Sequence, residues 1–195
     1  MHFLGISGSL RRQSLNTAAL RACIKLVPPG VTLSLADISA IPLYNEEIRE
    51  QGLPAPVMTL RDQIMKADAI LIATPEYNYS MPGVLKNAID WASRPPSQPF
   101  EGKPIALISA SPGGFGGARA QYHLRQVFIY LNGLILNRPE AMISAAHTKF
   151  DAQGELTDSA TADQLRSVLT GLADWTRLVQ AGQSAGQTAA GKVQS

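Results

Sequence analysis

Apolar residues along this chain fall into two patterns, short unbroken runs and longer stretches with the spacing of a helix. Ala69–Ala73 reads AILIA and Ile105–Ser109 reads IALIS, and such continuous runs are typical of strands covered on both faces of a sheet. Arg119–Leu131 instead places apolar residues at i, i+3, i+4 and i+7, which predicts a helix with one buried face. The two patterns alternate along most of the chain.

This alternation predicts a parallel sheet, because successive parallel strands are joined by crossover helices. We therefore expect an α/β fold, a three-layer sandwich built on five strands. Residues 41–56 carry prolines and charges, and we expect them to form a long surface loop. The predicted strands are Phe3–Ser7, Val31–Leu35, Ala69–Ala73, Ile105–Ser109 and the short candidates Leu134–Leu136 and Ala141–Ser144. The predicted helices are Leu15–Val27, Pro54–Lys66, Val84–Ala92, Arg119–Leu131 and Thr161–Gln180.

Length and composition are those of a globular protein. The 195 residues, of which 45% are hydrophobic and 16% charged, suit one domain with a sizeable core, here residues 1–181. Residues 182–195 are small, polar and aperiodic, so we expect a flexible C-terminal tail. The net charge of +2, without any block of like charges, argues against a nucleic-acid partner.

The sequence predicts neither a signal peptide nor a membrane-spanning segment. The first residues, MHFLGISGS, do not read as a signal peptide, and no stretch approaches the roughly 18 apolar residues of a membrane span. We therefore expect a cytoplasmic protein that does not enter the membrane. Cys23 is the single cysteine, so no internal disulfide can form, and its place in a predicted helix indicates a buried apolar role.

Three unusual loops follow the first, third and fourth predicted strands. In an open parallel sheet, ligands bind beyond the carboxyl ends of the strands, where the strand order reverses. The first loop, GSLRRQSLN at residues 8–16, precedes a helix, whose N-terminal N–H groups suit a phosphate. Ser9, Ser14 and Asn16 offer side-chain donors, and Arg11 offers charge-assisted bonds. An ordinary turn with Ser14 as helix cap explains the same residues, so both interpretations stay open here.

The second loop opens TPEYNYSMPGVLKNAIDW, residues 74–91. Tyr77, Tyr79 and Met81 are large apolar or aromatic side chains in this loop, and they need a surface outside the loop to cover them. A flat heteroaromatic ligand would provide it, and so would the core or another subunit.

The third loop, SASPGGFGGAR at residues 109–119, holds four glycines within five positions. This density predicts a backbone with positive φ, or one that approaches a ligand closely with its N–H groups, although a flexible surface loop is the simpler alternative.

Taken together, the three segments resemble the NADPH-dependent FMN reductases, and most closely their chromate and quinone reductase branch. The resemblance is carried by G-S-L-R-x-x-S-x-N, P-E-Y-N-Y-S-x-P-G-x-L-K-N-A-I-D-W and S-x-S-P-G-G-x-G-G-x-R, and it covers about residues 3–180. It implies a flavodoxin-like fold with strand order 2-1-3-4-5 and FMN at the switch point, where the strand order reverses. It also implies a homodimer or homotetramer.

Family positions carry over residue by residue. The resemblance implies that the first loop binds the FMN phosphate, the second runs along the isoalloxazine ring and ribityl chain, and the third flanks the far edge of the ring. The matching residues are Ser9, Arg11, Ser14 and Asn16 in the first loop, Pro75, Glu76, Tyr77 and Asn78 in the second, and Ser109, Gly113 and Gly114 in the third.

The resemblance implies an enzyme that moves a hydride from NADPH or NADH to bound FMN and two electrons onward to quinones, chromate or other small acceptors. One ring face serving both substrates in turn predicts ping-pong kinetics. We predict no metal site and no catalytic acid or base, and His2, His123 and His147 lie outside the three loops. The choice between NADH and NADPH, and between dimer and tetramer, stays open.

Alternative functions are a free-flavin reductase, an azoreductase and, outside enzymes, a flavodoxin-type electron carrier. Such carriers tend to be strongly acidic, whereas this chain is slightly basic. A dinucleotide-binding dehydrogenase would need G-x-G-x-x-G after the first strand, which Gly5 and Gly8 do not supply. A phospho-accepting signalling domain would need an aspartate where Thr74 and Pro75 stand.

Overall fold

The computed structural model describes residues 1–193 and centres on one sheet in which all strand pairs are parallel. The path of hydrogen-bonded neighbours is β2-β1-β3-β4-β5, the flavodoxin-like order expected from the sequence. The strands are β1 (His2–Ser7), β2 (Thr32–Ala36), β3 (Ala69–Ala73), β4 (Pro104–Ala110), β5 (Leu134–Ile135) and β6 (Ala141–Ile143). The prediction of β3 agrees residue for residue.

The sheet has six strands where five were expected, because its last position is shared. β5 pairs with the start of β4 at Pro104 and Ile105, and β6 pairs with the end of β4 from Ile108 to Ala110. The two short candidate strands therefore both form. They lie one after the other beside β4 and are separated by residues 136–140.

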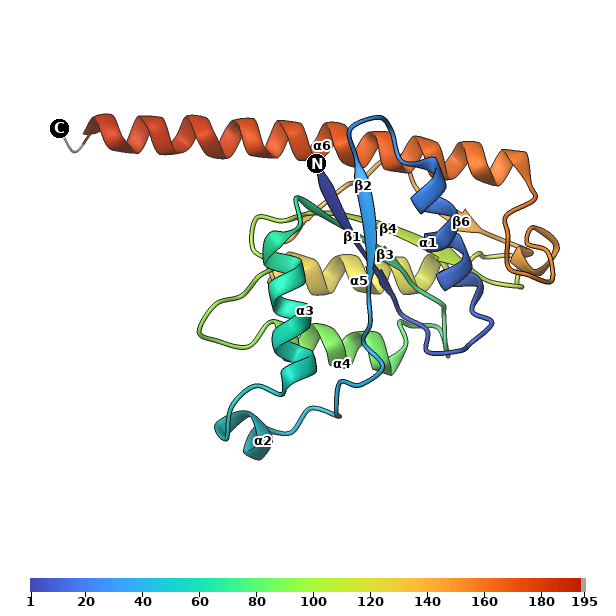
Figure 1. Cartoon of the computed structure of the whole chain (residues 1–195), viewed down its shortest axis with the longest axis horizontal. Helices are drawn as coiled ribbons and strands as arrows, with labels where there is room; N and C mark the ends of the chain where they lie inside the picture. The colour runs from blue at the N-terminus through green and yellow to red at the C-terminus, as the bar shows by residue number, and fades with distance from the viewer. Residues whose placement is uncertain (194–195) are drawn as a thin grey trace.

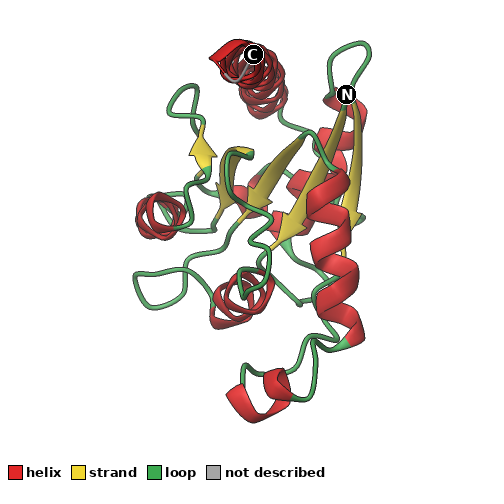
Figure 2. Ribbon diagram, turned by 90° about the vertical axis from the view of Figure 1, so that its left-hand side faces the viewer, coloured by secondary structure: helices red, strands yellow, loops and turns green. Residues whose placement is uncertain are grey.

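Helices cover both faces of the sheet and make a three-layer sandwich (Figure 2). One buried apolar cluster joins the sheet to α1 and α6, and a second joins its other face to α3, α4 and α5. Alternation of the strand side chains between these clusters explains why β3 and β4 are apolar throughout. The helices are α1 (Leu15–Leu26), α2 (Glu46–Glu50), α3 (Ala55–Lys66), α4 (Gly83–Ala92), α5 (Ala118–Tyr130) and α6 (Ser159–Val193), with a short 3-10 helix, η1 (Ala146–Thr148).

Two helical segments were not predicted. α2 lies within the predicted surface loop 41–56, where Asn45 caps it by accepting the N–H of Glu47. α6 continues from its predicted end at Gln180 to Val193 and runs past the body of the molecule (Figure 1). Residues 182–193 are thus helical rather than irregular, residues 194–195 lie outside the described residues, and the division into a domain and a flexible tail stays a prediction.

Within residues 1–193, no helix is both long enough and apolar enough to cross a bilayer.

Candidate active site

The three unusual loops leave the sheet side by side. Direct backbone bonds join the strand ends: the Gly8 N–H donates to the Ala73 carbonyl at 2.8 Å, and the Thr74 N–H donates to the Ile108 carbonyl at 3.0 Å. A groove of about 110 Å³ lies between the loops. Its lining comes from all three loops and consists of Ser9, Arg11, Ser14, Leu15, Asn16, Pro75, Glu76, Tyr77, Ala110, Ser111 and Pro112. Sequence-distant segments therefore meet at one edge, as the strand order requires.

The first loop ends in a capped helix that still has free donors. Ser14 is the N-cap of α1, and its hydroxyl oxygen accepts the Thr17 N–H at 3.2 Å. This bond uses the oxygen as acceptor and leaves the hydroxyl hydrogen available to the groove. The N–H groups of Leu15 and Asn16 lie in the first turn of α1, where no intrahelical acceptor exists. The cap and the anion site, which the sequence left as alternatives, are compatible.

Only one of the two arginines of the first loop lines the groove. Arg11 lines the groove together with Ser9, whose hydroxyl oxygen accepts the Arg11 N–H at 3.4 Å. Arg12 does not line this groove. Among the described residues, the guanidinium of Arg11 has neither a hydrogen bond nor an ion pair, so it can bind an anion without losing an existing partner.

Asn16 has a structural role that the sequence did not reveal. It is buried, and its side-chain amide bonds twice to one residue at the end of β4: Nδ2 donates to the Ala110 carbonyl, and Oδ1 accepts the Ala110 N–H, both at 2.9 Å. These two bonds join the first loop to the third. Only one amide hydrogen of Asn16 remains for a ligand, so its phosphate contact stays a prediction.

At Gly8, the first residue of the first loop, neighbouring side chains of the protein fill the space beside the backbone. A Cβ at Gly8 would meet Leu85 at 3.0 Å, Pro82 at 3.1 Å and Pro75 at 3.2 Å. The glycine therefore lets the first loop pack against the second, which brings Pro75 to the groove wall.

The second loop turns tightly at residues 77–80. The Tyr77 N–H donates to the Ser80 carbonyl at 2.9 Å, and the Ser80 N–H donates to the Tyr77 carbonyl at 3.0 Å. Asn78 and Tyr79, between them, have φ of 49° and 73°. Two successive positive φ angles are those of a type I′ turn, and for a tyrosine this conformation is strained. Such strain persists only where surrounding contacts hold the loop.

Glu76 supplies the main such contact. Its side chain is 7% exposed and forms an ion pair with Arg119, and Oε2 accepts the backbone N–H groups of Arg119 at 3.0 Å and Ala120 at 3.3 Å. The carboxylate therefore sits at the N-terminus of α5, where the helix dipole also favours it. Glu76 lines the groove, but its strongest bonds hold the second loop to the third.

Arg119 is the last residue of the pattern S-x-S-P-G-G-x-G-G-x-R but was not predicted as a site residue. Its guanidinium lies 3.9 Å from the ring centroid of Tyr79 and 4.6 Å from that of Phe115, a geometry that allows cation–π attraction to both. Hydrogen bonds to Tyr79 and Glu76 raise the pKa of Arg119. Tyr79 and Phe115 are 66% and 70% exposed, so this stack forms an aromatic surface outside the core.

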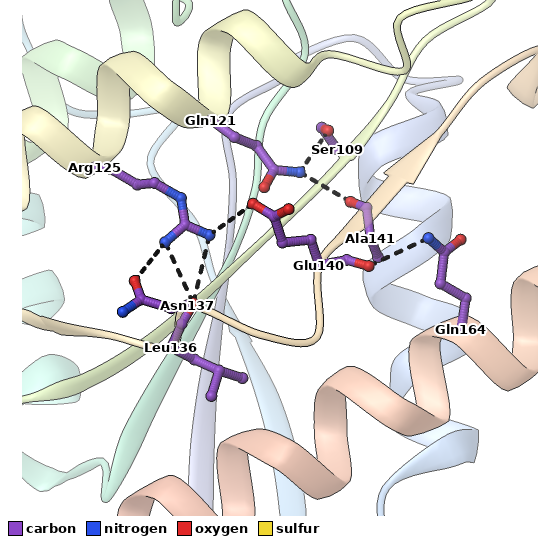
Figure 3. Close-up of polar contacts among 8 residues, drawn as sticks. All are labelled: Ser109, Gln121, Arg125, Leu136, Asn137, Glu140, Ala141 and Gln164. Carbon is purple, nitrogen blue, oxygen red and sulfur yellow. Dashed lines mark hydrogen bonds and ion pairs between the residues drawn. The ribbon is translucent and has the colours of Figure 1, made fainter.

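Ser109 lies behind the glycine loop and not in the groove. It is fully buried; its hydroxyl donates to the Gly116 carbonyl at 2.6 Å and accepts from Gln121 Nε2 at 2.7 Å. Gln121 in turn donates to the Ala141 carbonyl at 2.9 Å, which connects α5 to β6 (Figure 3). Ser109 therefore shapes the loop from behind, and its place beside the ring stays a prediction.

The four glycines of the third loop divide into two pairs. Gly116 and Gly117 have φ of 58° and 88°, and an added Cβ would lie 2.7 Å from Met142 or from Ser109. These two are needed for packing and turn geometry. Gly113 and Gly114 are exposed, and a Cβ on Gly114 would meet nothing within 4 Å. The predicted site glycines are thus the pair that leaves open space.

One histidine contacts the second loop despite lying outside it in sequence. His123 Nδ1 and the Ser80 hydroxyl are 2.8 Å apart. This is a second contact between α5 and the second loop, in addition to the one that Glu76 makes. Periodicity placed His123 on a helix but carried no signal for this contact.

The comparison with known proteins agrees with this geometry. A model of the family "NADPH-dependent FMN reductase" matches residues 1–148. The chain belongs to the NADPH-dependent FMN reductase family. It is therefore an oxidoreductase of a family named for FMN and NADPH, as the resemblance implied.

Individual relatives of this FMN reductase family member are similar over most of its length. The NAD(P)H-dependent FMN reductase of Pseudomonas aeruginosa is 60% identical over 174 residues, which are 89% of this chain and 94% of that protein. The quinone reductase of Escherichia coli K12 is 45% identical over 176 residues, again 89% of this chain and 94% of the relative. The solved structure of FerB, an NAD(P)H:(acceptor) oxidoreductase from Paracoccus denitrificans, superposes with a TM-score of 0.82 at 37% identity and covers 90% of this chain and 97% of its own.

Proposed function

We propose that this protein holds FMN with its phosphate in the groove at the start of α1 and passes two electrons from NAD(P)H to quinones. The observation that carries the proposal is the convergence of three loops on a groove that contains Arg11, whose guanidinium has no partner among the described residues. The names of the relatives support the donor and the acceptor class, since they include an NAD(P)H-dependent FMN reductase and quinone reductases.

The donors in the groove fit a phosphate monoester. Arg11 provides a cation, the Ser14 hydroxyl keeps a hydrogen to donate, and the first turn of α1 adds two N–H groups and the positive end of its dipole. No carboxylate lies in the first loop to oppose a dianion. Glu76, the acidic residue on the lining, is neutralised by Arg119 and by the N–H groups of α5.

The groove is far smaller than the roughly 300–1,000 Å³ typical of pockets that enclose a small molecule. The ring of FMN would therefore extend beyond it, beside Tyr77 and the open space at Gly114. When bound, FMN supplies hydride acceptance from the nicotinamide and two-electron donation to the acceptor. The chain's own residues position the ring: Arg119 holds Glu76 and the two aromatic side chains in place.

Overall, NAD(P)H, one proton and a quinone give NAD(P)⁺ and a hydroquinone. Because donor and acceptor would use the same open face in turn, we predict ping-pong kinetics. An open face demands little of the acceptor, so chromate, azo compounds and free flavin stay predicted alternatives. A cytoplasmic location, expected from the sequence, would suit an enzyme that draws on NAD(P)H.

A reduction assay on the purified protein tests the proposal. FMN is added, the unbound fraction is removed, and the absorbance spectrum and the oxidation of NADPH and NADH with benzoquinone are recorded. We expect a yellow protein that turns over with either donor and gives parallel lines in double-reciprocal plots. A flavodoxin-type carrier would bind FMN but turn over poorly alone, and a protein that remains colourless would contradict the proposal.

A further inference from the structure

A second cleft opens beside the phosphate groove and is much larger, about 570 Å³. It lies between the first loop, α1 and the segment that follows β6, and it shares Arg11, Ser14, Leu15 and Pro112 with the groove. Its volume is within the range of pockets that take small organic ligands. The groove and the cleft therefore adjoin at these four shared residues.

Three arginines line the cleft: Arg11, Arg12 and Arg21. All three are exposed, and none of their guanidinium groups has a hydrogen bond or an ion pair with any described residue. Most other arginines of the chain are engaged, for example Arg49 with Glu46 and Arg125 with Glu140.

Like charges on one cleft wall repel each other, and an anion bound among these guanidinium groups would remove that repulsion. The acidic residue on the same lining, Asp151, offsets them only in part. Its Oδ1 already accepts the backbone N–H groups of Gln153 at 2.9 Å and Glu155 at 2.8 Å. The cleft therefore presents a net positive wall beside the proposed FMN phosphate.

FMN has one phosphate, and the groove accounts for it with Arg11 and the start of α1. Arg12 and Arg21 then remain for a second anion. Arg21 lies on the face of α1 that also carries Leu15 and Ala18, and these two residues line the cleft with it. A planar guanidinium is well matched to phosphate oxygens and is a usual partner of the 2′-phosphate that distinguishes NADPH from NADH.

We infer that Arg12 and Arg21 bind the 2′-phosphate of NADPH, so that this cleft gives the protein its preference for NADPH over NADH. The inference rests on the proposed function, because the dinucleotide is a ligand only if it is the hydride donor. It also addresses the choice between NADH and NADPH, which the sequence left open because no local pattern in it identifies a residue that contacts the 2′-phosphate.

Calorimetry on the FMN-loaded protein tests the cleft without turnover. Adenosine 2′,5′-bisphosphate, 5′-AMP and inorganic phosphate are titrated separately into the wild type and into Arg12→Gln, Arg21→Gln and Arg138→Gln. Arg138 is the matched control, an exposed arginine with no side-chain partner among the described residues and no place on the cleft lining. We expect the bisphosphate to bind the wild type most tightly and to lose roughly tenfold in affinity in each of the first two variants, but not in the control.

Steady-state kinetics provide the second arm. In Arg12→Gln and Arg21→Gln, the KM for NADPH should rise roughly tenfold, with kcat, the KM for NADH and the affinity for FMN unchanged. Equal binding of bisphosphate and 5′-AMP to the wild type, binding of inorganic phosphate as tight as that of the bisphosphate, or equal changes for NADPH and NADH would each overturn the inference. If the protein oxidises neither dinucleotide, the proposed function fails, while calorimetry still decides whether the cleft recognises the bisphosphate.

Discussion

Glu76 and Arg119 lie 43 positions apart in the chain and form an ion pair at the N-terminus of α5. The same carboxylate accepts two backbone N–H groups of that helix, so one side chain joins the loop after β3 to the loop after β4. These loops form two of the three walls of the candidate site, and their separation depends on this contact.

Replacement of Glu76 should therefore loosen the site in a graded way. Glu76→Gln keeps an oxygen that can accept the N–H groups of α5 but removes the charge, and Glu76→Ala removes both interactions. We expect melting temperature and FMN affinity to fall in the order wild type, Gln, Ala, as measured by thermal denaturation and flavin fluorescence. Equal FMN affinity in all three proteins would show that the ion pair does not shape the site.

Arg11→Ala should weaken FMN binding by about tenfold to a hundredfold, because a charge-assisted bond to a phosphate is lost. The side chain is exposed and has no partner among the described residues, so the melting temperature of the apoprotein should not change. Fluorescence titration with FMN measures the first quantity, with Arg138→Ala as the control. An unchanged dissociation constant would contradict the phosphate assignment.

Substitutions at two glycines distinguish a glycine that leaves room for FMN from one that the fold itself requires. Gly114→Val should leave the apoprotein folded, because a Cβ there meets nothing within 4 Å, but should prevent FMN from binding by occupying the space beside the ring. Gly117→Val should instead destabilise the fold, since φ is +88° and a Cβ would lie 2.7 Å from Ser109. Circular dichroism and the flavin spectrum distinguish these outcomes, and a normally yellow Gly114→Val protein would count against the ring position.

Self-association is expected from apolar surface that the single chain leaves uncovered. Ile129 and Tyr130 on α5 are 78% and 86% exposed, and Tyr77 and Tyr79 add aromatic surface near the groove. Surface of this kind commonly marks an interface. We predict a dimer or tetramer at micromolar concentration, measured by light scattering, and Tyr130→Glu should shift the mass downward. A monomeric mass for the wild type would refute this prediction.

Cys23 should be chemically silent in the folded protein. Burial raises the pKa of its thiol to about 12, so the reactive thiolate is scarce at neutral pH. A thiol reagent should label the protein only after denaturation. The thiol of the unfolded chain ionises at a lower pH than the folded one, so ionisation favours the unfolded state. Between the ordinary pKa and the folded pKa of Cys23, the free energy of unfolding should therefore fall by about 1.4 kcal/mol per pH unit. Cys23→Ala should lack this part of the pH dependence in urea titrations, and rapid labelling of the native protein would contradict the assignment.

Local patterns in the sequence determined where the elements lie and which loops meet. β3 is apolar at every position and α5 has helical spacing, and these properties depend only on near neighbours in the chain. The alternation of strands and helices allows few topologies, so the sheet edge at which segments 8–16, 74–91 and 109–119 begin could be predicted before any coordinates.

Tertiary structure alone decided how individual side chains are used. The amide of Asn16, a predicted phosphate donor, bonds to Ala110, 94 positions away. The hydroxyl of Ser109, a residue predicted beside the ring, bonds to Gly116 and Gln121. Such pairings depend on distances in the packed molecule, which periodicity does not encode. For the same reason, only the structure shows that Arg11 lines both the groove and the cleft, whereas Arg12 and Arg21 line the cleft alone. It also shows that no described residue pairs with the three guanidinium groups.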